Sequence, residues 1–114
     1  MAKSTTSKKE RFENIMRPNR HLGYDYFKVG IYICNKGAYK IAEVLFKRAV
    51  WLNPFEPKFK IHLARCLYHL NLLEEAHKWI IEALNQDLED KDAQIVLKWI
   101  NESIKSNNKL GETK

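Results

Sequence analysis

Hydrophobic and polar positions follow one pattern twice within residues 24–87, with an offset of 34 residues between the copies. In each copy the apolar side chains recur at i, i+3, i+4 and i+7, which is the spacing of one face of a helix. When the copies are aligned, Gly30 falls on Ala64, so a small residue meets a small one. Phe46 falls on Ile80, so a large residue meets a large one. The pattern therefore predicts two copies of one helical hairpin.

Turn and capping residues set the expected helix ends. Gly37 and Asn71 stand at the turns inside the two hairpins, where a residue in the left-handed region commonly ends a helix. Pro54 closes the second helix, because the residue before a proline avoids the helical region. Five helices are expected, at about 24–36, 38–52, 56–70, 73–86 and 91–105.

Gly30 is expected to mark a close approach of two helices. A glycine inside a helix costs about 1 kcal/mol relative to alanine, so its presence indicates that another helix needs the space. We expect Gly30 to lie against Ala42, and its counterpart Ala64 against Ala76. The inward stripe of this first helix is expected to consist of Tyr26, Val29, Gly30 and Ile33.

The fifth helix begins a third copy of the pattern but does not complete it. Lys98 and Asn101 stand where that copy would carry a small and an apolar residue. Polar residues at these positions are typical of a terminal capping helix whose outer face is exposed to solvent. The expected organisation is a flexible basic arm at 1–21, a repeat domain at 22–106 and a disordered tail at 107–114. Within the domain, the repeats are expected at about 22–55 and 56–89 and the capping helix at about 91–105.

Residues 24–106 resemble two tetratricopeptide repeats followed by a capping helix. The phrase GAYKIAEVLFKRAVWLNP carries most of the resemblance. The matching motif positions are Gly30, Gly37, Ala42, Phe46, Ala49 and Pro54, then Leu63, Ala64, Leu67, Ala76, Ile80 and Ala83. The resemblance implies an all-α fold of antiparallel helix pairs stacked as a short right-handed superhelix. It also implies a concave face, lined by the leading helix of each pair, that binds peptides of partner proteins without catalysis.

The composition of the 114 residues is that of one ordinary globular domain, with a net charge of +6. The arm at 1–21 carries six Lys and Arg against two Glu, which favours a solvated tail over a nucleic-acid site. No apolar run reaches the ~18 residues of a membrane span, so a cytoplasmic protein is expected. Cys34 and Cys66 lie on different expected helices and are expected to be buried free thiols.

Candidate catalytic and metal-binding groups are few. His62 and His69 share a helix face but are separated by about 10 Å of helical rise, too far to share a metal ion. The chain has no glycine-rich loop that would hold a phosphate. We therefore expect neither an enzyme nor a cofactor nor a metal site.

The concave face carries the functional prediction. By helical phase, the expected peptide-binding groove consists of Phe27, Ile31, Asn35, Lys58, Ile61, Arg65, Tyr68, His69, Ile95 and Trp99. Some members of the family that the chain resembles bind acidic C-terminal tails through lysine, asparagine and arginine on this face. Here Phe27, Ile31 and Ile61 occupy several of those places, so the groove suits an amphipathic helix or an apolar extended peptide. Lys58 and Arg65 remain as anchors for one acidic group.

Three alternatives remain open from the sequence. Two repeats bury little surface, and three or more are usually needed for stability. One alternative is therefore that the chain itself fills the groove. Its own segment 10–17, with Phe12, Ile15 and Met16 at helical spacing, is one candidate, and another copy of the chain is a second. The remaining alternatives are a small chaperone-like protein, which the basic charge disfavours, and nucleic-acid contact through the arm at 1–21.

Overall fold

The computed structural model describes residues 20–112, and over this range the chain is helical without strands. The predicted segment at 10–17 and most of the predicted arm lie outside the described residues. The helices are α2 (Arg20–Asn35), α3 (Tyr39–Leu52), α4 (Pro57–His69), α5 (Leu73–Gln86) and α6 (Lys91–Glu112).

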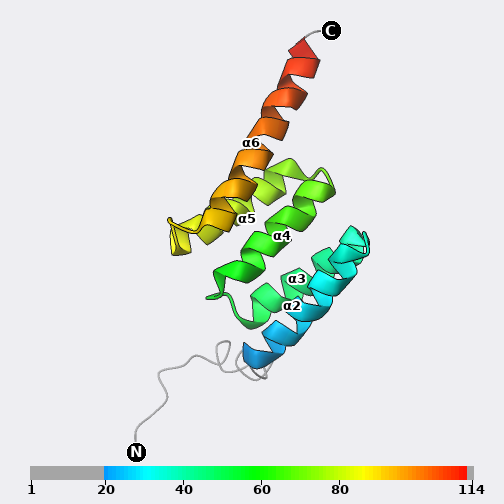
Figure 1. The fold of residues 1–114 in the computed structure, drawn as a ribbon, viewed down its shortest axis with the longest axis vertical. Helices are drawn as coiled ribbons and strands as arrows, with labels where there is room; N and C mark the ends of the chain where they lie inside the picture. Colours follow the sequence, from blue (N-terminus) through cyan, green and yellow to red (C-terminus); the bar gives the residue numbers. More distant parts are fainter. Residues whose placement is uncertain (1–19, 113–114) are drawn as a thin grey trace, which may run out of the picture.

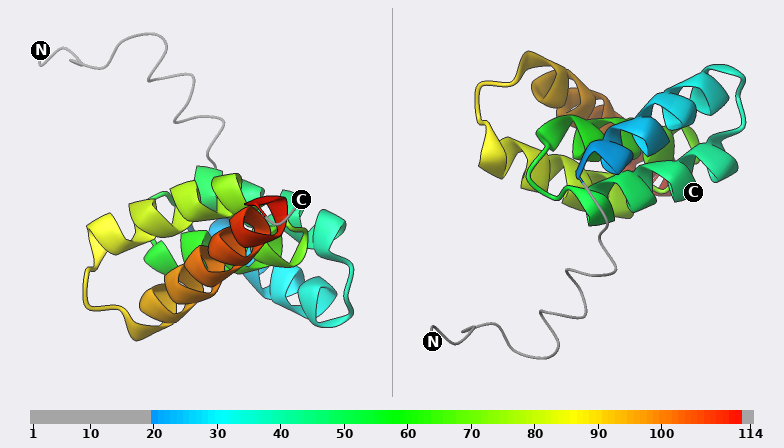
Figure 2. Two further views of the ribbon diagram at one scale, coloured as in Figure 1. Left: turned by 90° about the horizontal axis from the view of Figure 1, so that it is seen from above. Right: turned by 90° about the horizontal axis from the view of Figure 1, so that it is seen from below.

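The helices form two hairpins and a final helix in two layers. α2 packs with α3, α4 packs with α5, and α6 packs on α5 and α4. Figure 1 shows α2, α4 and α6 side by side in the nearer layer, with α3 and α5 behind them. Figure 2 shows the stack from its two ends, with α6 at one end and the α2/α3 hairpin at the other. The predicted all-α fold of stacked antiparallel helix pairs is confirmed.

The core follows the 34-residue pattern. Phe46 and its counterpart Ile80 are both fully buried, as are the small residues Ala42 and Ala76. α6 adds Ala93, Val96 and Ile100 to the same hydrophobic cluster. Its residues Lys98 and Asn101 are exposed, so the predicted wet face of the capping helix is confirmed.

Both hairpin turns have the expected left-handed residue. Gly37 has φ 84° and Asn71 has φ 62°. After each of them the next backbone N–H reaches back five residues, from Ala38 to the carbonyl of Ile33 at 3.3 Å and from Leu72 to the carbonyl of Leu67 at 2.9 Å. These bonds pair carbonyls that a helix end leaves without a partner. The two turns therefore have the same backbone hydrogen bond, although asparagine replaces glycine in the second.

Two helices are longer than the pattern predicts. α2 begins at Arg20, four residues before the expected Tyr24, and so starts within the segment expected to form the flexible arm. Gly23 lets this extra turn pack closely on its neighbours, because a Cβ added there would lie only 3.2 Å from the Phe59 ring and 3.3 Å from the Ala49 carbonyl oxygen. α6 extends to Glu112, into the residues expected to form a disordered tail. No proline interrupts this stretch, and Ile104 still packs against the core.

One packing prediction for α2 is wrong, and another is made more specific. A Cβ added at Gly30 would meet ring atoms of Phe46 at 2.7, 2.9 and 3.2 Å, so the Phe46 ring fills the space beside Gly30. Val29, expected to face inward, is 51% exposed. Its counterpart Leu63 is fully buried on α4, which has a preceding hairpin packed against it.

Candidate functional site

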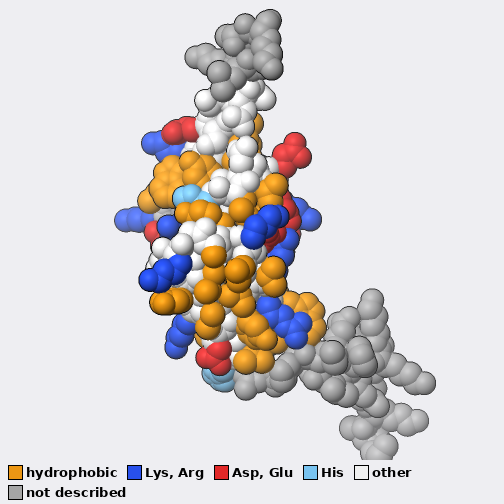
Figure 3. Space-filling view, turned by 90° about the vertical axis from the view of Figure 1, so that its right-hand side faces the viewer, with side chains coloured by type: hydrophobic (Ala, Val, Ile, Leu, Met, Phe, Trp, Pro, Cys, Tyr) orange, Lys and Arg blue, Asp and Glu red, His pale blue; other side chains and the backbone are white. Residues whose placement is uncertain are grey.

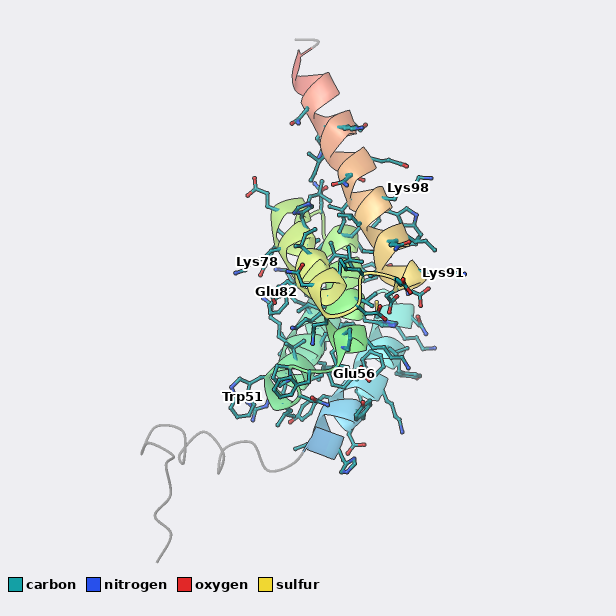
Figure 4. The ribbon with its side chains drawn as sticks, turned by 90° about the vertical axis from the view of Figure 1, so that its left-hand side faces the viewer. Trp51, Glu56, Lys78, Glu82, Lys91 and Lys98 are labelled. Carbon is teal, nitrogen blue, oxygen red and sulfur yellow. The ribbon has the colours of Figure 1, made fainter. Side chains whose placement is uncertain are left out.

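The leading helices α2 and α4 of the two pairs and the capping helix α6 form one continuous surface, which we call the groove. On α2 and α4 the rings of Phe27 and His62 meet edge to face, with centroids 4.9 Å apart. On α4 and α6 the rings of Tyr68 and Trp99 lie 5.9 Å apart. Figure 4 shows that Lys91 and Lys98 of α6 lie on one side of the molecule, while Lys78 of α5 lies on the other. The groove thus belongs to the layer of α2, α4 and α6.

The first half of the groove is a small cavity between α2 and α4. Its volume is about 150 Å³. It is lined by Ile31, Cys34, Asn35, His62, Arg65 and His69. Four predicted site residues, Ile31, Asn35, Arg65 and His69, are therefore brought together by the fold. Arg65 and His69 are exposed, which leaves polar hydrogen-bond donors at the rim and apolar surface on the α2 side.

His62 forms part of the floor of this cavity and is neutral at pH 7. Burial, mainly, together with the nearby charges of Arg65 and Lys58, lowers the pKa of His62 to about 4 from its usual 6.5. Asp92 of α6 acts in the opposite direction and raises that pKa. His62 therefore adds no positive charge to the groove at pH 7, whereas Lys58 and Arg65 do.

The second half of the groove is aromatic. Trp99 is 38% exposed, and Ile95, one turn earlier on α6, is also exposed. Tyr68 packs against the Trp99 ring and lies 5.4 Å from the ring of His69. The His69 ring in turn stacks on Tyr39 at 4.8 Å with an interplanar angle of 13°. These contacts fix the aromatic side chains in place, so less conformational freedom is lost when a ligand covers them.

Ile61 does not line the groove. It is only 3% exposed and belongs to the hydrophobic core. Phe27 is partly buried against Phe46 and Phe59, with centroids at 6.0 and 4.9 Å, so it supports the groove from below. His62 is not among the groove residues predicted from the sequence. Helical phase places the edge of the groove at Ile61, one residue too early. His62 lies four residues after Lys58 and three residues before Arg65. Residues at these separations share one face of a helix, so the two predicted cationic residues could have identified it.

The remaining chemistry of the described residues is structural. Cys34 and Cys66 are free thiols, as predicted, but only Cys66 is buried, whereas Cys34 is partly exposed. The Cys66 thiol donates a hydrogen bond to the Tyr39 carbonyl at 3.0 Å, and burial raises its pKa to about 12, which suppresses the reactive thiolate. Residues 20–112 contain no group of three side chains placed to hold a metal ion. None of the described helices is long and apolar enough to cross a membrane.

A family model described as tetratricopeptide repeat matches residues 36–100. The chain belongs to the tetratricopeptide repeat family. The match runs from the first turn to the buried Ile100, which covers the hairpin of α4 and α5 and the helices on either side of it. A search of curated proteins found no match. Tetratricopeptide repeats form a protein-interaction fold, so protein partners are indicated for this chain.

Proposed function

We propose that the tetratricopeptide groove of α2, α4 and α6 binds a peptide segment of a partner protein, and that the chain acts as an adaptor. The observation that carries the proposal is the exposed ring of Trp99, packed on the partly buried Tyr68, beside the cavity that Arg65 lines. Large aromatic side chains and arginine are the residue types that dominate binding energies at interfaces. A soluble helix also gains little from leaving a tryptophan partly in water unless another surface covers it.

The two halves of the groove define the chemistry of the proposed peptide. Trp99, Tyr68 and Ile95 suit apolar side chains of an amphipathic helix or extended strand. Lys58 and Arg65 suit one carboxylate placed near the α2/α4 cavity. The proposed ligand is therefore an apolar peptide with a single acidic residue, in contrast to a run of acidic residues.

Trp99→Ala is expected to weaken binding of such a peptide at least tenfold, or about 1.4 kcal/mol, because it removes an aromatic anchor of the groove. A displayed library of short random peptides, selected on the wild-type chain, supplies the probe. Each selected peptide is then titrated by fluorescence anisotropy while thermal unfolding of the same variant is recorded. Trp51→Ala on α3 is the matched control, because its ring lies on the opposite layer under Arg48 at 4.6 Å.

The two tryptophan variants separate a groove from a merely structural residue. Lost affinity at unchanged thermal stability for Trp99→Ala alone supports the groove. Equal affinity of wild type and Trp99→Ala for every selected peptide would show that peptides dock elsewhere.

Arg65→Gln is expected to reduce affinity several-fold for those selected peptides that carry an aspartate or glutamate, and to leave purely apolar peptides unchanged. The difference should shrink as salt is added, since exposed charges are screened over about 10 Å at 0.1 M. Lys78→Gln on α5 removes one positive charge from the other side of the molecule and is the control. If Lys78→Gln lost as much affinity, the effect of Arg65→Gln would be due to the net charge of the chain and not to a contact in the groove.

The same exposed residues keep one alternative open, namely a second copy of the chain in the groove. Sedimentation at micromolar concentration distinguishes the two, because a dimer that Trp99→Asp dissociates would place a copy of the chain where we propose a peptide. Nucleic-acid contact through the basic arm stays a prediction, and most of that arm lies outside the described residues.

A further inference from the structure

One side of α2 exposes residues whose repeat counterparts are buried. Val29 is 51% exposed and Tyr32 is 61% exposed. Their counterparts 34 residues later, Leu63 and Cys66, are fully buried on α4. The difference does not lie in residue type alone, because valine and leucine are both apolar. It arises because the preceding hairpin packs on α4, through α3, whereas α2 is the first helix that the structure describes.

This uncovered side continues from α2 onto α3. We call it the stacking face, and it consists of Tyr26, Val29 and Ile33 of α2 with Ile41, Val44 and Leu45 of α3. Ile41 and Val44 are 58% and 66% exposed. Tyr26, Val44 and Leu45 border a common hollow of about 540 Å³. Figure 3 shows a broad group of hydrophobic side chains over the part of the surface formed by α2 and α3, with basic side chains around it. A contiguous apolar patch of this kind usually marks a docking site.

The sequence places a candidate occupant at the matching repeat position. Counting back 34 residues from Phe46, Ala49 and Val50 leads to Phe12, Ile15 and Met16. The three α3 residues are among those by which α3 joins the hydrophobic core. Segment 10–17 therefore carries apolar residues at the register of the helix that would cover α2, just as α3 covers α4.

The connection to α2 has a suitable length. Only residues 18 and 19 separate the segment from Arg20, where α2 begins, and two to five residues commonly join antiparallel helices. Pro18 favours a break at that point. Eight helical residues span about 12 Å, which is enough to run back along α2 from its first turn past Tyr26 to Val29.

We infer that residues 10–17 pack as a short helix on the stacking face, over Tyr26 and Val29, and complete the N-terminal end of the repeat stack. The chain then supplies the trailing helix of a half repeat at one end, as α6 supplies the leading helix of a half repeat at the other. The surface involved is separate from the groove, so the groove remains available to a partner. A stack closed at both ends also offsets the small core of two repeats.

The experiment uses the full chain and five variants: Phe12→Asp in the segment, Val29→Asp on the stacking face, the double variant, Trp99→Asp in the groove, and Leu88→Asp. Leu88 is exposed in the loop between α5 and α6 and is the matched control. Amide hydrogen exchange should be about tenfold slower at 10–17 in the wild type than in either single variant. The double variant should have the same melting temperature as the more affected single variant, because both changes break one contact. Leu88→Asp should leave the exchange at 10–17 unchanged.

Three results would overturn the inference. The first is fast exchange at 10–17 in the wild-type chain, equal to that in Phe12→Asp. The second is slow exchange that survives Val29→Asp but is lost in Trp99→Asp, which would place the segment in the groove. The third is a wild-type dimer that Val29→Asp converts to a monomer in sedimentation, since a second copy would then cover the stacking face. A monomer with slow exchange at 10–17 and non-additive variants supports the inference.

Discussion

Gly30→Leu should lower the free energy of unfolding by about 3 kcal/mol or more, because it forces a branched side chain into a filled space. Even a Cβ at this position would lie 2.7 Å from Cε1 of Phe46. The Phe46 ring is fully buried, with Phe27 and His62 each at 6.0 Å between centroids, so it has little room to move away. A loss of this size is a large share of the ~5–15 kcal/mol that stabilises a native protein. Urea unfolding followed by circular dichroism measures it.

Two further variants make this result specific to the contact with Phe46. Lys28→Leu places the same side chain at an exposed site on α2 and should change stability by less than about 0.5 kcal/mol. Gly30→Ala with Phe46→Ile copies the Ala64 and Ile80 pair of the second repeat, and should be less destabilising than the sum of its single changes. Wild-type stability of Gly30→Leu would contradict the packing described here.

The hairpins were predictable because their signals are local. The turns at Gly37 and Asn71 require a left-handed residue, and that requirement is visible in one position of the sequence. Helix type follows from periodicity, which is summed over many residues and tolerates individual exceptions. The fold and the stacking order therefore needed no knowledge of side-chain contacts.

The identity of the groove residues depended on finer geometry. Ile61 and His62 are neighbours separated by about 100° around α4, and the edge of the groove falls between them. Hydrophobicity favoured Ile61 as a binding residue, but α4 is covered on more than one side and buries it. Sequence phase alone cannot place a face boundary to within one residue, because that boundary is set by how closely neighbouring helices approach.

Exposure on α2 could not be predicted for a different reason. Val29 has the spacing and chemistry of a core residue, and its counterpart Leu63 is one. Whether such a residue is buried depends on what packs against its helix, which is a property of the neighbouring segment. The lengths of α2 and α6 depend on neighbouring segments in the same way. Gly23 of α2 lies against residues of α3 and α4, and Ile104 of α6 packs against the core. Neither contact is visible in the local sequence pattern.

Acid should destabilise this protein through His62. The pKa of His62 is about 4 in the folded chain and 6.5 is its usual value, so the unfolded chain binds a proton more readily than the folded one below pH 6.5. Stability is fully retained above pH 6.5 and is lost as the pH falls from 6.5 toward 4. A shift of this size corresponds to a loss of about 3 kcal/mol at the low end of that range. Burial beside Phe27 and the positive charges of Arg65 and Lys58 oppose protonation, while Asp92 on α6 partly favours it.

His62→Gln isolates this contribution, because glutamine has similar polarity and does not titrate. Urea unfolding at a series of pH values should show a smaller fall in stability between pH 6.5 and pH 4 for His62→Gln than for the wild type. Parallel pH profiles for His62→Gln and the wild type would mean that the His62 ring is open to water and that the floor of the groove is not closed by Phe27.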